Sequence, residues 1–360
     1  MPARDSVEVE YLEGLHLTRS ILWLDAPRLA ELCFVSNALL HPVGPHRRLL
    51  LSERTAALLG PGTGARPHML VTPFYRNFVV GELQLQLAPS GHMPGASQLR
   101  IGRGRQQLVY TGDFNPRPSL CAERIHFWQA PRLVLKAHYG LAGDVFPAVE
   151  REQARALAWT EKVLAGGATA VWLYLHPPTA LELHQLLGRA GYTPLLHRSL
   201  LPLADAYVRA GIRLASYRRS SHRARVIIWP WRLRLSSALS RRGRLQMALA
   251  SGEVLRPDSR RRLGVEHGFC LSTRADRNDL LAMVERVGAR KVYLTGRCAE
   301  EVAHWLGKLG LRASVLAPPR QLQLFGASGG GGNSTDGQNP PGSDMEVEDQ
   351  RSQDQPGEPA

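Results

Sequence analysis

The sequence predicts an α/β fold in which a strand-rich first part carries an inserted unit of alternating strands and helices. Up to residue 136, apolar residues recur in short alternating runs, which are typical of half-buried strands. From residue 149 onward, helical stretches alternate with short apolar runs, and this alternation indicates βαβ units with a parallel sheet. With 44% hydrophobic residues in 360, the chain can bury cores for both parts.

Short strands dominate the first part. A short helix is expected to begin at Ser52, because serine is a good N-cap residue. A turn at Gly102-Arg103-Gly104 is expected to join the last two strands of the stretch 83–116. The expected strands are two runs within 8–25, then 32–37, 48–52, 69–73, 78–87, 97–101, 107–111 and 132–136.

The second part alternates strands with longer helices. Helices are expected at 149–165, 178–189, 202–210, 277–287 and 299–309. Strands are expected from Ala170 and Val226, near Leu249, and at 194–197, 269–272, 291–295 and 312–316. The predicted division is a first domain part at 1–150, an insertion at 151–264, a return to the first domain at 265–325, and an acidic tail at 326–360 that we expect to be disordered.

The charge balance favours an anionic partner. The formal net charge is +14, and the tail carries seven acidic residues against Arg351 alone, so the first 325 residues hold about +20. Such an excess favours nucleic acid through phosphate neutralisation, although an arginine-rich proteome would give the same balance without that role. No apolar run is long enough to span a membrane and no secretory signal is present, so we expect a cytoplasmic protein. The four cysteines show no C-x-x-C spacing and indicate no thiolate zinc site.

Two polar residues follow expected strands at positions where sites are often built. His92 lies in Ser-Gly-His-Met-Pro-Gly-Ala-Ser after the strand ending near 87, and Asp113 lies in Tyr-Thr-Gly-Asp-Phe after the strand 107–111. Loops at one edge of a rigid sheet commonly carry functional side chains. We therefore take His92 and Asp113 as the first site candidates.

These stretches and several others occur in an order that resembles the metallo-β-lactamase-fold nucleases of the β-CASP group. The blocks are Gly14-Leu-His-Leu, Leu22-Trp-Leu-Asp25, Phe34-Val-Ser, the His92 and Asp113 segments, Ala248-Leu-Ala-Ser-Gly, Gly268-Phe-Cys-Leu-Ser-Thr-Arg-Ala-Asp and Lys291-Val-Tyr-Leu-Thr. The chain is most similar to bacterial ligase-associated DNA exonucleases and more distantly to RNA 3′-end processing nucleases. The resemblance implies an αββα sandwich with an inserted β-CASP-like domain, and two divalent metals, commonly zinc, that hydrolyse phosphodiesters.

The metal ligands that the resemblance implies are mostly absent. The family's His-x-His-x-Asp-His cluster reads Asn37, Leu39, His41 and Pro42 here. Leucine and proline have no donor atom for a metal.

Later ligand positions have changed as well. Lys136, Arg274 and Gly296 replace an acidic residue and two histidines of the family pattern. His92 and Asp113 remain as residual ligands, and Asp25 is expected to support the site structurally.

The replacements add positive charge, so a phosphate-binding site is predicted in place of a metal centre. Lys136, Arg274 and Arg297 are its expected phosphate ligands. A lysine or arginine can bind a phosphate but cannot lower the pKa of a bound water to about 7, as the hydrolysis requires. The leading hypothesis is a catalytically degenerate protein that binds DNA or RNA, with no cofactor or a weakly bound one. Random drift after loss of activity would leave the same replacements.

An active nuclease is the main alternative. His41, His92, Asp113 and His138 together could rebuild one mononuclear zinc or manganese site, with Asp113 and His92 then catalytic. A structural scaffold without nucleic-acid binding is a third hypothesis. The expected partners are nucleic acid and either an active nuclease paralogue or a DNA ligase or helicase system, with roles in DNA repair or RNA processing.

The stretch 213–262 contains fourteen arginines and two acidic residues. Tyr217, Trp229 and Trp231 are interleaved with them, a combination that suits binding of single strands. A solvated basic face with buried tryptophans is the alternative. The first candidates for nucleic-acid contacts are Arg218, Arg219, Arg223 and Arg225.

Overall fold

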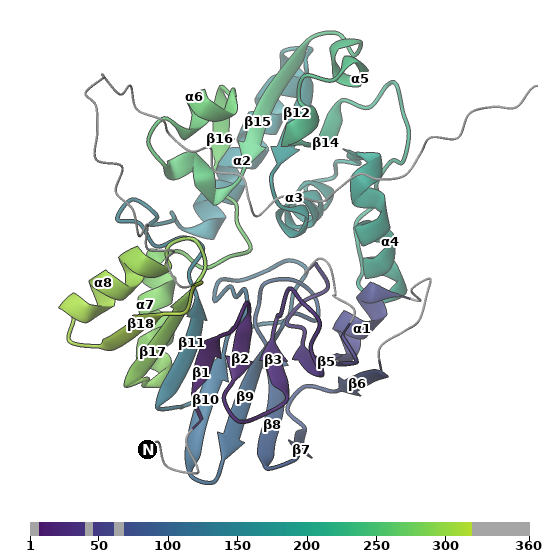
Figure 1. Cartoon of the computed structure of the whole chain (residues 1–360). Coiled ribbons are helices and arrows are strands. Elements are labelled where there is room, and N and C mark those ends of the chain that lie inside the picture. The colour runs from purple at the N-terminus through teal and green to yellow at the C-terminus, as the bar shows by residue number, and fades with distance from the viewer. Residues whose placement is uncertain (1–6, 40–45, 61–67, 319–360) are drawn as a thin grey trace, which may run out of the picture. The chain divides into compact units, whose positions relative to one another are not determined.

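The protein is an α/β fold built on three β-sheets (Figure 1), as its sequence predicts. The computed structural model describes residues 7–39, 46–60 and 68–318. No helix among these residues is long and apolar enough to cross a membrane.

Sheet A comes from the first part of the chain and has the order β1-β2-β3-β4-β5-β6. Its strands are β1 Val9–Tyr11, β2 Leu15–Leu17, β3 Leu22–Leu24, β4 Leu32–Phe34, β5 Arg48–Ser52 and β6 His68–Thr72. Helix α1, Glu53–Leu59, follows β5, and the hydroxyl of Ser52 accepts a hydrogen bond from the Thr55 amide at its start, as expected for an N-cap.

Sheet B joins the first part of the chain to its last strands, in the order β18-β17-β11-β10-β9-β8-β7. Its strands are β7 Asn77–Val80, β8 Leu83–Pro89, β9 Ser97–Arg103, β10 Gln106–Tyr110, β11 Arg132–Lys136, β17 Lys291–Thr295 and β18 Arg312–Val315. The continuous strand expected at 78–87 was wrong: the chain turns at Gly81, with φ 59°, and forms the β7–β8 hairpin. A glycine tolerates this left-handed conformation without a Cβ clash.

Sheets A and B pack face to face. Leucines from β2, β3, β8 and β9 share one core with Phe34 and Tyr110. Helices α7, Arg277–Val287, and α8, Ala299–Lys308, cover the outer face of sheet B over β11 and β17, while α1 packs on the outer face of sheet A. The layers are therefore helix, sheet, sheet, helix.

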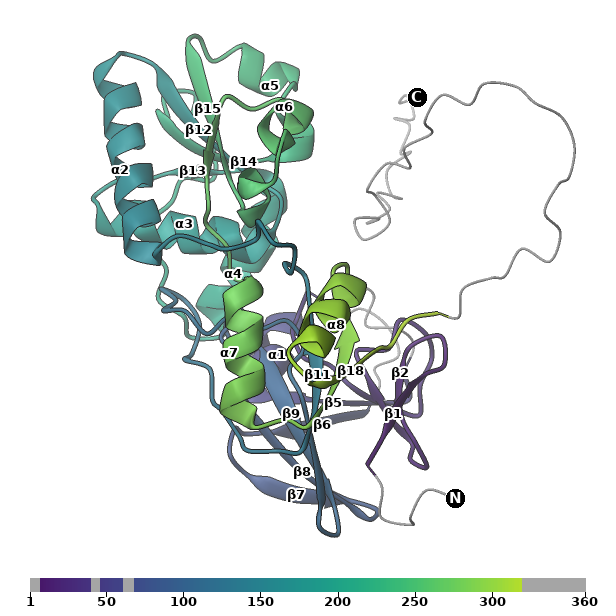
Figure 2. The ribbon, with the colours of Figure 1, turned by 90° about the vertical axis from the view of Figure 1, so that its left-hand side faces the viewer.

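Sheet C is parallel throughout and has the order β13-β14-β12-β15-β16. Its strands are β12 Thr169–Tyr174, β13 Leu195–Leu196, β14 Val226–Pro230, β15 Leu245–Ala250 and β16 His267–Phe269. The helices of this region are α2 Val149–Ala165, α3 Pro177–Arg189, α4 Leu201–Arg209, α5 Ser237–Ser240 and α6 Ser259–Leu263. Figure 2 shows α2 and α3 on one side of sheet C and α5 and α6 on the other.

The predicted domain boundaries at 150, 264 and 325 stay predictions. Sheets A and B draw their strands from 9–136 and 291–315, whereas sheet C draws its strands from 169–269. The predicted tail, 326–360, lies outside the described residues.

Candidate functional site

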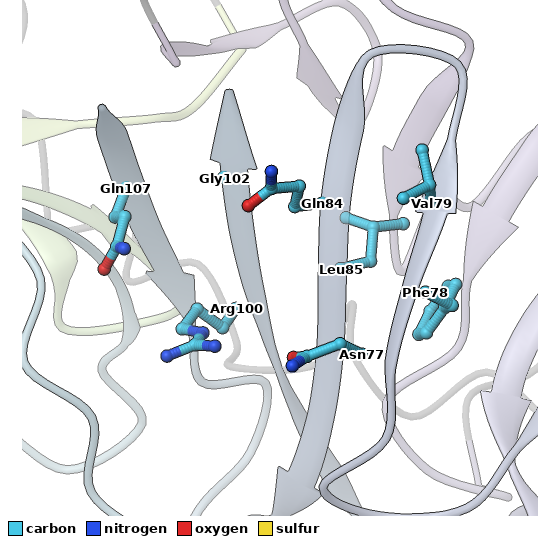
Figure 3. A pocket seen from close by; sticks show the side chains of 8 residues that line it. All are labelled: Asn77, Phe78, Val79, Gln84, Leu85, Arg100, Gly102 and Gln107. Atoms are coloured by element: carbon cyan, nitrogen blue, oxygen red, sulfur yellow. The ribbon is translucent and has the colours of Figure 1, made fainter. Parts of the chain in front are cut away.

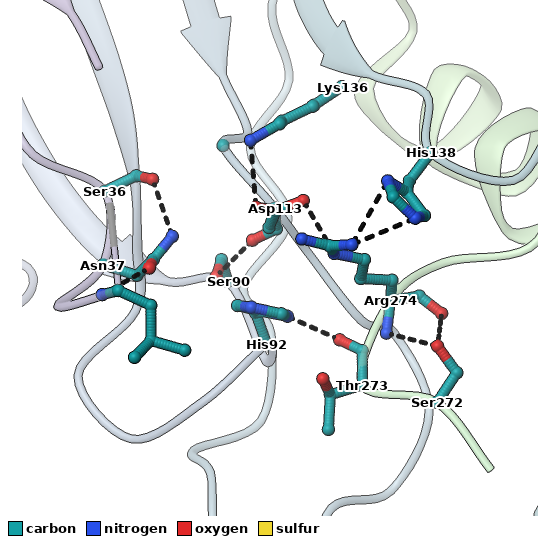
Figure 4. Close-up of polar contacts among 12 residues, drawn as sticks. Ser36, Asn37, Ser90, His92, Asp113, Lys136, His138, Ser272, Thr273 and Arg274 are labelled. Carbon is teal, nitrogen blue, oxygen red and sulfur yellow. Dashed lines mark hydrogen bonds and ion pairs between the residues drawn. The ribbon is translucent and has the colours of Figure 1, made fainter. Parts of the chain in front are cut away.

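Polar side chains from distant parts of the sequence meet at the end of sheet B (Figure 4). Strands β10, β11 and β17 are parallel neighbours, so their carboxyl ends share one edge of the sheet. Asp113 follows β10, Lys136 ends β11 and His138 follows it. His92 enters from the loop after β8, and Arg274 from the segment between β16 and α7. We call Asp113, Lys136, Arg274, His92 and His138 the Asp113 cluster.

Asp113 is the anion at the centre of this cluster. Its Oδ2 lies 3.0 Å from the ammonium nitrogen of Lys136, and its Oδ1 lies 3.2 Å from Nε of Arg274. The lysine contact is a hydrogen bond. The arginine contact is an ion pair without hydrogen-bond geometry, because Nε of Arg274 has no hydrogen-bond partner among the described residues. Both carboxylate oxygens therefore face a cation.

The charge state of Asp113 follows from a competition between burial and these cations. Burial by itself would raise the pKa of the carboxyl, but Arg274 and Lys136 outweigh it and hold the pKa well below its usual range. Asp113 is thus a carboxylate at neutral pH. Two cations surround one anion, so the three groups together carry a positive charge.

His92 is buried and neutral in this arrangement. Its Nδ1 donates to the backbone carbonyl of Thr273, at 2.8 Å, which fixes the ring across a sequence separation of 181 residues. Burial lowers the pKa of His92 to about 4, against the opposing attraction of Asp113. The neutral ring carries its proton on the side facing Thr273.

His138 lies against the guanidinium of Arg274. Nη1 of Arg274 is 3.0 Å from Nε2 and 3.2 Å from Nδ1 of the ring. Burial, and then the charge of Arg274, lower the pKa of His138 well below its ordinary value. The unprotonated nitrogen of a neutral imidazole accepts hydrogen bonds, so His138 can accept one from Nη1 of Arg274.

Asp25 and Asn37 are held by local contacts. Asp25 accepts hydrogen bonds from the Ser36 amide and hydroxyl, both at 2.7 Å, and from the Tyr110 hydroxyl at 2.6 Å. Burial raises the pKa of this carboxyl despite the nearby charge of Lys136. Asn37 accepts from the amide of Leu39 and donates to Ser36 Oγ. These side chains brace the loop after β4.

The residues of the Asp113 cluster do not fit a dinuclear metal centre. The carboxylate that would bridge two cations already binds an ammonium and a guanidinium group. Over the described residues, no group of three or more His, Cys, Asp and Glu side chains lies together in a way that could hold a metal ion. His41, the fourth candidate for a rebuilt site, lies outside the described residues.

Arg297 is paired with a carboxylate outside the cluster. Its guanidinium binds Glu253, which also lies 3.4 Å from Arg256. Arg256 in turn pairs with the fully buried carboxylate of Asp144. The predicted phosphate role of Arg297 stays a prediction. In the structure, Arg297 links the loop after β17 to the segment after β15.

The sequence did not lead us to predict one residue of the site. His176 follows β12, and its ring centroid lies 5.2 Å from that of His92. Burial lowers its pKa well below the ordinary value, and its Nδ1 is buried without a hydrogen-bond partner among the described residues. Its position directly after a parallel strand was the available signal, since loops at the carboxyl ends of such strands carry functional groups.

The other predicted nucleic-acid contacts lie elsewhere. Arg218, Arg219, Arg223 and Arg225 precede β14, whereas His176 follows β12. Because β12 and β14 are parallel, the start of β14 and the end of β12 lie at opposite edges of sheet C. Arg223 and Arg225 directly precede β14 and lie at that opposite end, whereas Arg218 pairs with Leu195 of β13 and Arg219 with Asp205 of α4. The predicted phosphate ligands therefore lie in several regions and not in one.

The aromatic residues of the arginine-rich stretch make contacts within the protein. Trp229 is buried on one face of sheet C and donates to the carbonyl of Leu233, at 3.0 Å. Trp231 packs against the same core and donates to the carbonyl of Leu263, at 2.7 Å. Tyr217 donates to Asp205. Trp229 is buried and Trp231 is half-buried, and the stacking role of the aromatic residues stays a prediction.

A hollow of about 340 Å³ lies on the outer face of sheet B (Figure 3). Asn77, Gln84, Arg100 and Gln107 surround it, and Gly102 leaves space between the two glutamines. Gln107 lies at the start of β10, whereas Asp113 follows its end. The hollow is therefore separate from the Asp113 cluster, and its one cation, Arg100, also lies over the ring of Trp128.

Comparisons with known proteins show a relative and a shared fold. No family model matches the chain. A protein of Opitutus terrae called a probable DNA ligase is 28% identical over 322 residues, which are 88% of this chain and 32% of that protein. The chain thus spans about a third of the length of this curated relative. A crystal structure of an Enterococcus faecalis protein of unknown function superposes with a TM-score of 0.51 at 13% identity, covering 80% of this chain and 79% of that one.

Proposed function

We propose that this protein binds nucleic acid at the Asp113 cluster without metal-dependent cleavage, as a degenerate member of the metallo-β-lactamase-fold β-CASP nucleases. Two sheets packed between helices, with sheet C between the strands of sheet B in sequence, support the fold part of the proposal. The replaced ligands Asn37, Leu39 and Gly296 support the degeneracy.

The observation that carries the proposal is the pairing of Asp113 with Lys136 and Arg274. An ammonium and a guanidinium group occupy the places around the carboxylate that a metal pair would need. The side chains of Lys136 and Arg274 remain 24% and 20% exposed, while that of Asp113 is 6% exposed. A phosphate can therefore approach the outward-facing part of either cation, whose positive charge Asp113 compensates only in part.

DNA is the better supported nucleic acid. The relative of which this chain covers a part is called a probable DNA ligase. We accordingly propose that the protein acts beside a DNA ligase or in the same repair system, with an active nuclease paralogue as a further candidate partner. RNA is the comparison substrate in the test below.

The test measures metal content, cleavage and binding on the same preparation. Protein purified without chelator is analysed by mass spectrometry for zinc and manganese, and then incubated with single- and double-stranded DNA and RNA with either metal added. We expect far less than one metal per chain and no cleavage. Fluorescence anisotropy should show DNA binding that weakens as salt rises.

Matched variants locate the binding. Lys136→Gln removes one cation beside Asp113, and we expect about tenfold weaker binding, which is ~1.4 kcal/mol. Lys136→Arg keeps the charge and should stay within about twofold of the wild type. One or two bound metals, with cleavage that Asp113→Ala abolishes, would contradict the proposal and establish an active nuclease. Tight binding that neither Lys136→Gln nor Arg274→Gln weakens would place the contact elsewhere.

A further inference from the structure

We propose that sheet C carries a second binding surface for nucleic-acid phosphates at the end where its parallel strands begin, which we call its amino edge. This surface is separate from the Asp113 cluster. Its exposed members are Arg223, Arg241 and Arg244, and we call these three the amino-edge patch. The inference rests on the proposed nucleic-acid function and adds a surface to it.

Parallel topology gathers the patch from two separate loops. Arg223 lies three residues before β14, and Arg241 and Arg244 lie just before β15. β14 and β15 flank β12 on its two sides, both parallel to it. The backbone agrees, since Arg244 O accepts from Thr169 N, at 2.9 Å, and Arg225 O accepts from Ala170 N, at 2.8 Å. The two loops therefore meet at the start of β12.

Two further arginines hold these loops in place. Nη2 of Arg225 donates to the carbonyls of Leu164 and Ala168, at 2.6 and 3.1 Å, and so binds the loop before β14 to the end of α2. Nη1 of Arg242 donates to the carbonyl of Ser221, at 2.9 Å, and links the loop before β15 to the loop before β14. Arg225 and Arg242 thus position the patch, and their substitution would disturb the loops.

Within the described residues, no carboxylate offsets the positive charge of the three patch arginines. All three are exposed, and no ion pair within 7–39, 46–60 and 68–318 involves them. Arg219, by contrast, pairs with Asp205, and Arg256 pairs with Asp144. An exposed cluster of guanidinium groups without counter-charges favours a polyanion, because its phosphates release condensed counterions on binding.

The length of sheet C separates the patch from the Asp113 cluster. β12 has six residues, which span about 20 Å at ~3.3 Å per residue. The patch lies at the start of this strand, and His176, which contacts His92, follows its end. In duplex geometry, with ~3.4 Å between phosphates along one strand, about six nucleotides cover that distance. An oligonucleotide too short to cover it can reach only one of the two surfaces.

The experiment compares two variants that each lose three positive charges. The patch variant carries Arg223→Gln, Arg241→Gln and Arg244→Gln. The control carries Arg76→Gln, Arg290→Gln and Arg312→Gln, three exposed arginines outside sheet C and its connections. Thermal unfolding and circular dichroism establish that both are folded. Binding is then measured by anisotropy on single-stranded DNA of about 30 and about 4 nucleotides over a range of salt.

We expect the patch variant to bind the long DNA at least about tenfold more weakly, with a salt slope smaller by about two, since ~0.7 counterion is released per phosphate of a single strand. The control should stay within about twofold. Lysine substitutions at the three patch positions should retain most of the affinity. With the short DNA, Lys136→Gln should weaken binding by more than the patch variant does.

Each other outcome overturns a named part. An equal loss in the control and the patch variant would show a general charge effect and refute the patch. If the patch variant binds the long DNA as tightly as the wild type does, the patch is not a binding surface, and the proposed function is unaffected. A wild-type protein that binds neither DNA refutes the proposed function itself.

Discussion

The Asp113 cluster and the amino-edge patch both present positive charge, but the protein treats that charge in opposite ways. Lys136 and Arg274 are mostly buried and share one buried carboxylate. Arg223, Arg241 and Arg244 are exposed and have no carboxylate partner among the described residues. The cations of the cluster are therefore shielded and partly compensated, whereas those of the patch are solvated and have no compensating carboxylate within the part of the chain that the structure describes. Positive charge counted along the sequence does not show which of these two states a residue occupies.

Among the substitutions that test the difference between cluster and patch, Asp113→Ala is expected to change stability the most. The substitution leaves Lys136 and Arg274 facing each other without their anion, and we expect a loss of about 2–4 kcal/mol in the free energy of unfolding, because removing one partner of a buried ion pair leaves uncompensated charge. Urea unfolding measures it. The exposed pair of Glu31 with Arg47 is the control, and Glu31→Ala should cost at most about 0.5 kcal/mol. Equal losses would show that the cluster is solvated like the patch.

We expect the loss of stability in acid to come from titration of His92 and Asp113 in the cluster, because the arginines of the patch stay protonated. The folded pKa of His92 lies at about 4, below its usual 6.5, so the unfolded state binds the proton first as pH falls from 6.5 to 4. Stability is full above pH 6.5 and falls by up to about 3 kcal/mol across that window. Asp113, with its lowered pKa, adds a further loss at lower pH, because its contribution is present only above the pKa of the unfolded carboxyl.

His92→Gln isolates that contribution. Glutamine keeps a donor for the carbonyl of Thr273 and does not titrate, so the slope of unfolding free energy against pH between 4 and 6.5 should become shallower. His222→Gln, in the exposed loop beside the patch, is the matched control for the substitution itself. A slope unchanged by His92→Gln would mean that the ring is not held neutral in the folded protein.

Trp231 tests whether an aromatic residue of the arginine-rich stretch contributes to stability or to DNA binding. Trp231→Phe removes a hydrogen bond to the carbonyl of Leu263 and should cost about 1 kcal/mol of stability. DNA affinity should stay within about twofold, because the ring packs on the core of sheet C. Unfolding and anisotropy on one preparation separate the two effects. A tenfold loss of affinity with unchanged stability would restore the stacking role.

Arg297→Ala should have the smallest effect. Arg297 binds Glu253, and Arg256 stays near the same carboxylate after the substitution, so we expect less than about 0.5 kcal/mol of stability and less than about a twofold change in DNA affinity. The same titration that tests Lys136→Gln measures it. A loss as large as that of Lys136→Gln would make Arg297 part of the binding site.

Much of the fold follows from local patterns. The helix expected at 149–165 forms over Val149–Ala165, and the helix expected at 277–287 forms over Arg277–Val287, where Asp276 and Asp279 cap its start. The strand alternation of 83, 85 and 87 places those leucines in the core between sheets A and B. Periodicity determines which face of an element is buried, so these predictions need no tertiary information. The turn at Gly81 was missed because apolar residues continue on both sides of it.

The sequence by itself determined the α/β class, the longer helices, most of the strands and the identity of the residues that replace the expected metal ligands. Only the tertiary structure decided that Lys136 and Arg274 form ion pairs with Asp113. It also decided that the rings of His176 and His92 lie together and that Arg297 pairs with Glu253. It further decided that the loops carrying Arg223 and Arg244 meet at the end of sheet C opposite His176. The physical reason is that charge interactions depend on distance and burial between groups far apart in the sequence, such as Asp113 and Arg274, and no local pattern encodes that proximity.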